Sequence, residues 1–157
     1  MRSYPRFKLP YGYKKRLVSA LSAYRSAHRL TPWETADQEW GQELLSDLVD
    51  EPTWQAMRSL LLARVTDVTG HPFKPDEFSV VLHWGRGDVP YHRDRMARTC
   101  FLIPIHCSPT LTFEVEGYRP LRLDETRLVR FNDHNRHGLH NPNGARFLIA
   151  SLTRDLL

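Results

Sequence analysis

The sequence has 157 residues, of which 41% are hydrophobic and 25% are charged, a composition typical of one soluble globular domain. A chain of this length buries roughly 70% of the surface that it exposes when unfolded, so its stability requires no disulfide or structural metal. No run approaches the roughly 18 consecutive apolar residues of a membrane span, and the N-terminus has charges where a signal peptide has its apolar segment. We therefore predict a single domain over residues 1–157, located in the cytoplasm.

Charged residues are segregated in the first third of the chain. Residues 1–30 contain eight lysines and arginines and no acidic residue, whereas residues 31–57 contain seven acidic residues and no lysine or arginine. We expect the two blocks to form ion pairs across adjacent helices. A basic arm that binds nucleic acid or an acidic partner stays open as the alternative.

Residues 1–70 have the apolar spacing of helices. The first predicted helix ends before Pro32, and its stripe comprises Leu17, Leu21, Tyr24 and His28. A second helix is predicted over residues 40–49, with a stripe of Trp40, Leu44, Leu45, Leu48 and Val49. The third is predicted between an N-cap at Asp50 and a terminating Gly70, with Pro52 in its first turn.

Residues 71–157 change to the period of β-strands. Apolar and polar residues alternate over 78–84 and 111–115, and apolar runs at 99–105, 128–131 and 146–153 fit further strands. The polar stretch 132–145 is predicted to be a turn. Seven or eight short strands are typical of a sandwich or barrel, and helices packed on one sheet make the class α+β, mainly β.

A histidine and an aspartate are two residues apart in the run Tyr91-His92-Arg93-Asp94. Residues i and i+2 of a strand project on the same face, so His92 and Asp94 can reach one metal ion. A histidine from a distant strand would complete a two-histidine, one-carboxylate facial triad, which favours non-haem Fe(II) and leaves positions open for substrates. Arg146 then starts an apolar strand, where an inward-pointing arginine requires an anion such as a carboxylate.

This order of residues resembles the Fe(II)- and 2-oxoglutarate-dependent dioxygenases, whose motif is HxD, a distal His and an Arg shortly after it. The stretch from Val89 to Leu152 is most similar to the aspartyl/asparaginyl β-hydroxylase branch. The shared features are a proline just before the first ligand, Ile103-Pro104, Phe131-Asn132-Asp133, His137-Gly-Leu-His-Asn and Arg146. The resemblance implies a double-stranded β-helix (a cupin-like jelly roll) over residues 71–157, with residues 1–70 as a helical buttress.

The same resemblance implies hydroxylation of a C–H bond with Fe(II), 2-oxoglutarate and O2, releasing succinate and CO2. By this resemblance His92 and Asp94 correspond to the proximal metal ligands, and Arg146 to the residue that binds the distal carboxylate of 2-oxoglutarate. His137 is the preferred distal ligand, because its spacing to Arg146 and its H-x-L-x-N context match the family. His140 is the alternative distal ligand.

Three further residues are site candidates by their position near the first ligand. Arg98 is a second candidate for binding 2-oxoglutarate, with a plain exposed arginine as the alternative. Trp84 and Arg86 precede the first ligand and are candidates for the rim of a substrate pocket, or simply for a turn.

The substrate is narrowed only to an amino acid, a peptidyl side chain or a small metabolite. Asp94 is present, whereas the animal aspartyl hydroxylases have a non-ligating residue there and the related halogenases vacate the position for chloride. This favours hydroxylation over halogenation, and it argues against a direct transfer of the aspartyl-hydroxylase substrate.

Three other functions stay open. AlkB-like nucleic-acid demethylases share HxD, His and Arg, and the basic N-terminus suits a phosphate backbone, but their second arginine corresponds to Leu152 here. A zinc hydrolase would need a general base, for which Asp133 is the candidate. A non-enzymatic cupin-like binding module would use its histidines only to satisfy turns.

Overall fold

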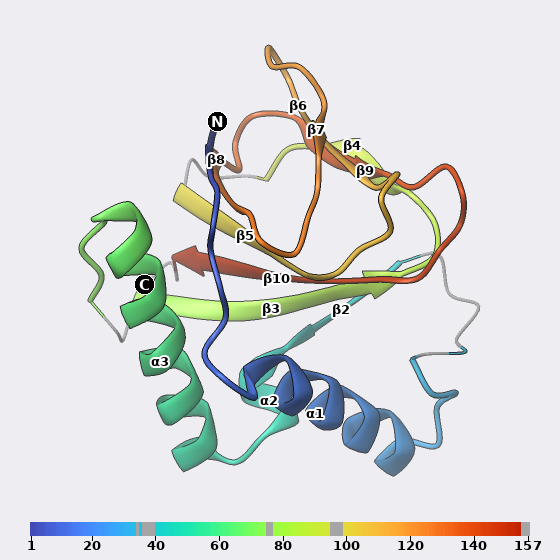
Figure 1. Ribbon diagram of the computed structural model, residues 1–157. Helices are drawn as coiled ribbons and strands as arrows, with labels where there is room; N and C mark the ends of the chain where they lie inside the picture. The colour runs from blue at the N-terminus through green and yellow to red at the C-terminus, as the bar shows by residue number, and fades with distance from the viewer. Residues whose placement is uncertain (34, 36–39, 75–76, 95–98, 155–157) are drawn as a thin grey trace.

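The computed structural model describes residues 1–33, 35, 40–74, 77–94 and 99–154. Two antiparallel sheets are stacked, with the helices on the far side of the larger sheet (Figure 1). The six-stranded sheet has the order β1-β8-β5-β10-β3-β2 and the four-stranded sheet the order β4-β9-β6-β7. The strands are β1 (Arg2–Tyr4), β2 (Gly41–Leu44), β3 (Phe78–Gly85), β4 (Val89–His92), β5 (Thr99–His106), β6 (Thr112–Val115), β7 (Leu121–Arg122), β8 (Leu128–Asn132), β9 (His137–His140) and β10 (Phe147–Arg154).

The strand order identifies a double-stranded β-helix. From β3 to β10 the chain passes back and forth between the two sheets, so that strands adjacent in sequence lie in opposite layers, apart from the β6–β7 hairpin within one layer. Connections that cross between the sheets in this way place β3 beside β10 and β4 beside β9. This is the jelly-roll topology, which confirms the predicted fold class. Among the strands that the structure describes, the two sheets do not close into a barrel.

Side-chain alternation in the six-stranded sheet produces two separate apolar cores. In β3 the buried residues Phe78, Val80, Leu82 and Trp84 face the helices, and β10 presents Leu148, Ala150 and Leu152 on the same side. The other face of the sheet packs on the four-stranded sheet, and its core includes Leu102, Phe113, Phe131 and Ile149. Because helices cover the apolar face of β3, its alternate, more polar residues point between the sheets.

Helices α1 (Tyr13–Ala27), α2 (Leu45–Leu48) and α3 (Glu51–Thr69) lie beneath the six-stranded sheet (Figure 1). α3 has the predicted limits: the Asp50 carboxylate accepts a hydrogen bond from the Thr53 amide at 2.8 Å, and Gly70 ends the helix with φ 69°. In α1 the buried face is continued by Arg25, while Tyr24 and His28 contact each other outside the core. No helix in the described ranges is long and apolar enough to cross a membrane.

Two strands in residues 1–70 correct the prediction that this segment is wholly helical. β1 pairs with β8, and β2 pairs with β3 at the opposite edge of the larger sheet. The predicted helix over residues 40–49 is therefore strand β2 followed by the single turn of α2. Pairing with the neighbouring strand outweighs a helical spacing in a segment this short.

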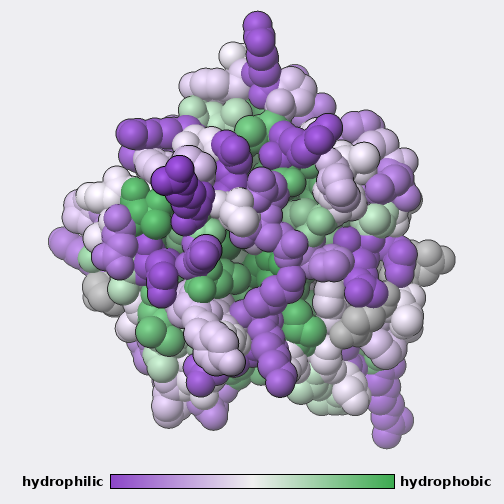
Figure 2. Space-filling model, viewed as in Figure 1, coloured by the Kyte–Doolittle hydropathy of each residue, from purple (hydrophilic) through white to green (hydrophobic). Residues whose placement is uncertain are grey.

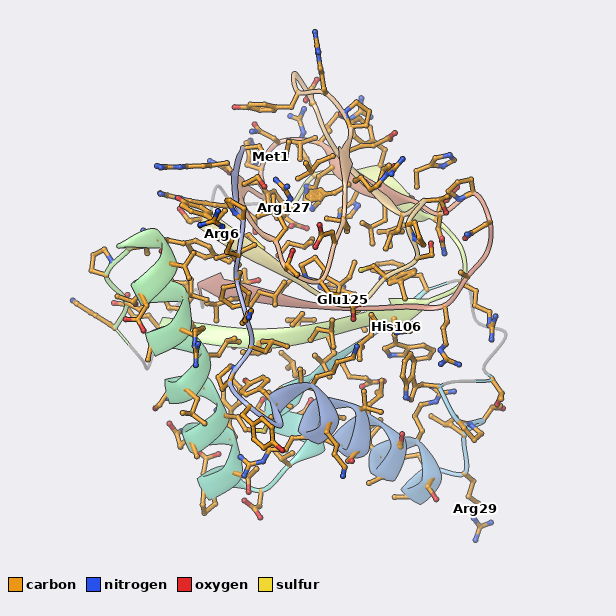
Figure 3. The ribbon with its side chains drawn as sticks, viewed as in Figure 1. Met1, Arg6, Arg29, His106, Glu125 and Arg127 are labelled. Carbon is orange, nitrogen blue, oxygen red and sulfur yellow. The ribbon has the colours of Figure 1, made fainter. Side chains whose placement is uncertain are left out.

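The predicted ion pairs between the basic and acidic N-terminal blocks are wrong for the part of the chain that the structure describes. Lys14 instead pairs with Glu125, which is in the loop above α1 (Figure 3), with an Nζ to Oε1 distance of 2.6 Å. Arg29, at the end of α1, points away from both sheets (Figure 3). Hydrophilic side chains project around the edge of the molecule and apolar residues show between them nearer the centre (Figure 2).

Candidate metal centre

His92, Asp94 and His137 converge at one end of the space between the sheets. One potential ligand atom from each residue lies within 4.8 Å of the other two. The Asp94 carboxylate faces both imidazoles, with Oδ1 3.9 Å from His92 Nε2 and Oδ2 3.7 Å from His137 Nε2. Two imidazole nitrogens and a carboxylate oxygen on one side of a cavity form the donor set of a facial triad.

Backbone hydrogen bonds orient both imidazoles toward this centre. His92 Nδ1 lies 2.6 Å from the Pro90 carbonyl oxygen, and His137 Nδ1 lies 2.7 Å from the Asn135 carbonyl oxygen. A carbonyl oxygen can only accept, so in the neutral rings Nδ1 carries the proton and Nε2 keeps its lone pair. Histidines that bind metals are commonly held in this way, with the second ring nitrogen donating to a backbone carbonyl. The three residues therefore fit a divalent metal ion.

A β-bulge brings His92 opposite His137. Between the pairs Val89–Leu139 and His92–His137, β4 contains one more residue than β9. Gly138 makes room for this bulge, because a Cβ atom there would lie 2.7 Å from the Val89 carbonyl oxygen. Bulges of this kind are common beside active sites, where they redirect a side chain. Gly138 is thus a structural determinant of the position of His92.

The turn before β9 fixes Asp94, which follows the end of β4. The Asp94 amide donates to the Asp133 carbonyl oxygen at 3.0 Å. His134 Nδ1 lies 3.1 Å from the carbonyl oxygen of Asp94, and the His134 amide donates to the Asn132 side chain. The same turn provides the Asn135 carbonyl that orients His137, so one short segment positions two of the three candidate ligands.

The triad borders a cavity of about 530 Å³ between the sheets. Its described lining is mostly apolar and includes Leu102, Phe113, Leu139 and Ile149. Its carboxylates are Asp94 and the buried Asp133, and its described lining contains no lysine or arginine. Trp40 and Leu44, which are 37% and 41% exposed, border the cavity from edge strand β2. The space is sufficient for a small molecule or a single side chain beside the metal position.

Burial lowers the pKa of His137, an effect that the positive form of His92 would add to and that the Asn135 carbonyl, Asp94 and Asp133 oppose. A neutral imidazole is the form that binds a metal ion. The environment of His137 therefore favours metal binding at neutral pH over binding of a proton.

Two cavity residues were missed by the sequence analysis. His83 of β3 and Ser151 of β10 both line the cavity, and His83 Nε2 lies 2.9 Å from Ser151 Oγ. Burial lowers the pKa of His83 to about 4, with Asp94 opposing the shift and His137 and His92 adding to it. The signal was present in the alternation of β3, because His83 lies on the strand face opposite Phe78, Val80, Leu82 and Trp84.

Arg146 does not line the cavity. Its guanidinium carbon lies 5.3 Å from the centre of the Trp33 ring, a buried residue of the helix-side core. Arg146 precedes β10 by one residue, and Leu148, two residues later, packs on that same side of the sheet. The inward position next to Arg146 is occupied by Phe147, which is fully buried in the core between the sheets. The Arg146 guanidinium thus lies on the helix side of the sheet, outside the described lining of the cavity.

The remaining candidates lie apart from the triad. Trp84 is 2% exposed in the helix-side core with Arg25 above its ring, so the prediction that it borders the substrate pocket is wrong. Arg86 is absent from the described cavity lining, and its carbonyl oxygen accepts from the Asn141 side chain. His140 is exposed, with Nδ1 3.4 Å from Asp88 Oδ1. Arg98 lies outside the described residues.

Strand β9, which contains His137 and His140, lies in a segment that was predicted to be a turn. The polar stretch 132–145 was predicted to be a turn, yet residues 137–140 form β9, paired with both β4 and β6. A strand position holds His137 more firmly than a loop would. The prediction failed because Gly138 and the neighbouring polar residues do not have the composition of a strand.

Comparison with known proteins identifies no family. No protein-family model matches the chain, and no curated protein matches it. Solved structures of similar fold include an RmlC-like cupin from Desulfovibrio desulfuricans, with 10% identity, 76% of this chain and 85% of that chain covered, and a TM-score of 0.46. Another is the cupin domain of an XRE-family transcriptional regulator from Enterobacter cloacae. The two sequences are 16% identical, the alignment covers 76% of this chain and 100% of that domain, and the TM-score is 0.46. Likeness at this level concerns the fold and identifies no activity.

The chain is thus a double-stranded β-helix protein with a histidine–aspartate–histidine cluster that could bind a metal ion.

Proposed function

We propose that this protein is a mononuclear Fe(II) dioxygenase that uses 2-oxoglutarate to hydroxylate a small substrate. The observation that carries the proposal is the triad of His92, Asp94 and His137, whose Nε2 and carboxylate atoms face one point at the border of a cavity. A mixed nitrogen and oxygen donor set with three protein ligands is typical of non-haem Fe(II) sites. When bound, Fe(II) would supply the activation of O2. Oxidative decarboxylation of 2-oxoglutarate would give two of the four electrons that reduce O2, and the substrate C–H bond would give the other two.

The overall reaction would insert one oxygen atom of O2 into a substrate C–H bond and the other into succinate, with release of CO2. The residues of this chain would position the co-substrate and the substrate and would exclude water from the site. Phe113, Leu139 and Ile149 give the cavity an apolar wall that excludes water beside the triad. An amino acid, a single peptidyl side chain or a small metabolite is of suitable size for the remaining space.

One observation favours a second candidate, a metal-binding cupin that does not use 2-oxoglutarate. Arg146, which the family resemblance implies as the anchor of the distal carboxylate, contacts Trp33 on the helix side of the sheet. If 2-oxoglutarate binds, other residues must hold that carboxylate. A metal-dependent enzyme with another co-substrate, or a binding module without catalysis, would need no such anchor.

The test is anaerobic spectroscopy of the purified protein with Fe(II) and then 2-oxoglutarate. The proposal predicts a weak visible charge-transfer band from the chelated complex, absent in His92→Ala and Asp94→Ala but retained in His140→Ala. The last variant is the matched control, because His140 is an exposed histidine of the same strand as His137. Metal binding without the band would favour the second candidate, and retention of zinc in place of iron would contradict the oxygenase.

A further inference from the structure

We infer that the His83–Ser151 pair is the polar anchor for the metal's organic co-substrate, binding the distal carboxylate of a 2-oxo dicarboxylic acid. The inference rests on the proposed function, because it assigns a residue pair to the co-substrate of the same metal centre. It assigns to β3 and β10 a role that the resemblance gave to Arg146.

The His83–Ser151 pair faces the same cavity as the candidate metal ligands. His83 and Ser151 lie on the inner face of the six-stranded sheet and line the same cavity as the triad. A molecule bound at the triad and extending into this cavity therefore borders the same space as the imidazole and the hydroxyl. The pair is not itself part of the triad, which leaves it available to a molecule extending from the metal into the cavity.

The His83–Ser151 pair has hydrogen-bonding capacity beyond the bond between its two members. His83 Nε2 and Ser151 Oγ are 2.9 Å apart, and a neutral imidazole has one donor and one acceptor nitrogen. If the serine hydroxyl donates to Nε2, the Nδ1–H group stays available, and if Nε2–H donates to the serine, the hydroxyl proton stays available. In either arrangement the pair keeps one donor for another partner, as a carboxylate oxygen requires.

The surroundings of the pair support a carboxylate ligand over a purely apolar one. The half-buried His83 and the buried Ser151 lose hydration that a ligand oxygen would replace.

The experiment compares two 2-oxo acids that share the metal-chelating end and differ in the distal carboxylate. 2-Oxoglutarate and 2-oxobutanoate are titrated anaerobically into the Mn(II)-loaded protein by calorimetry. The wild type should bind 2-oxoglutarate on the order of 10- to 100-fold more tightly, the range expected for a hydrogen bond to a charged group. Ser151→Ala and His83→Gln should each lower this ratio toward one, and the double variant should lower it little further, because the two residues act together.

Matched variants separate the anchor from general damage to the cavity. Thr153→Val removes a hydroxyl from the same face of β10, and Arg146→Gln tests the residue implied by the resemblance; both should keep the wild-type ratio. Manganese affinity should be unchanged in every single variant. Arg98→Gln should likewise keep the ratio.

The experiment distinguishes failure of the proposed function from failure of the assignment to His83 and Ser151. If the wild-type protein binds no Mn(II), or binds Mn(II) but neither 2-oxo acid, the proposed function itself is overturned. If the wild type prefers 2-oxoglutarate and Ser151→Ala and His83→Gln keep that preference, while Arg146→Gln or Arg98→Gln loses it, the proposed function stands and the assignment to His83 and Ser151 is overturned.

Discussion

His92 and His137 face each other across the β4–β9 pair, with their ring centroids 4.4 Å apart and their planes tilted by 55°. Each ring donates from Nδ1 to a backbone carbonyl close to it in sequence, and each directs Nε2 toward a different oxygen of Asp94. The orientation of the rings is therefore set by local backbone geometry, before any metal binds. A site organised in this way should bind metal with little rearrangement.

Replacement of His137 by alanine should abolish stoichiometric metal binding, because two ligands would remain. We expect the affinity for Co(II), a spectroscopic substitute for Fe(II), to fall by more than about 100-fold, since loss of an outer-sphere partner alone costs roughly 10- to 100-fold. Calorimetry and the visible absorption of bound Co(II) measure this. His140→Ala, which removes a solvent-exposed imidazole paired with Asp88, should bind Co(II) like the wild type. Equal loss in both variants would contradict the assignment of His137.

Replacement of Gly138 by alanine should weaken metal binding without removing a ligand. The added Cβ would lie 2.7 Å from the Val89 carbonyl oxygen and 3.2 Å from that of Pro90, both backbone atoms of the bulge that carries His92. We expect β4 to shift, with a loss of about 1–3 kcal/mol in the free energy of unfolding and at least tenfold weaker Co(II) binding.

Gly117→Ala is the control for this change. Gly117 has φ 85° and open space around it, so alanine there should be strained and lower stability but leave Co(II) affinity unchanged. Chemical denaturation and calorimetry on both variants separate the two effects. A Gly138→Ala protein with wild-type affinity would show that the bulge does not control the position of His92.

The sequence was sufficient to predict the parts of the fold that local chemistry determines. α3 has the expected N-cap at Asp50 and the expected end at Gly70, because capping bonds and a left-handed glycine act within one turn. The alternation over 78–84 identified β3, since a strand with one apolar face has apolar residues at every second position of the sequence. His92, Asp94 and His137, named from spacing and resemblance, are brought together.

Pairing with strands distant in the sequence determined the features that we did not predict, which are β2, β9 and the orientation of Arg146. β2 has a helical spacing of apolar residues but lies against β3, and β9 has the composition of a loop but lies between β4 and β6. The orientation of Arg146 follows from the register of β10, in which Phe147 and Leu148 face opposite cores. A shift of one residue exchanges the two faces of a strand, and spacing counted in the sequence cannot detect it.

Replacement of Tyr13 by phenylalanine should test the helical buttress separately from the metal centre. The Tyr13 hydroxyl donates to the Met57 carbonyl oxygen at 2.9 Å in the buried contact between α1 and α3, and burial raises the pKa of this phenol. Loss of the bond should cost about 1 kcal/mol in the free energy of unfolding, measured by urea denaturation, with Co(II) affinity unchanged. Tyr11→Phe, at a fully exposed position, should cost nothing measurable. Equal stability of the two variants would contradict the structural role of this bond.

The metal-free protein should lose stability as the pH falls, in part through His83. Burial lowers the pKa of His83 from its ordinary value of 6.5 to about 4, so the unfolded chain binds this proton more readily than the folded protein. Acid therefore favours unfolding: this contribution is absent above about pH 6.5, grows as the pH falls, and levels off below about pH 4. Its full size is up to about 3 kcal/mol.

The measurement is the free energy of unfolding in urea at pH 7 and pH 5, for the wild type and for His83→Gln. His137 shifts in the same direction and remains in both proteins, so the difference between their pH slopes isolates His83. We expect the variant to be less sensitive to acid, since glutamine does not titrate. Parallel slopes would mean that the cavity hydrates His83 well enough to keep its pKa near the ordinary value, and the imidazole would then carry a positive charge at mildly acidic pH even without a bound anion.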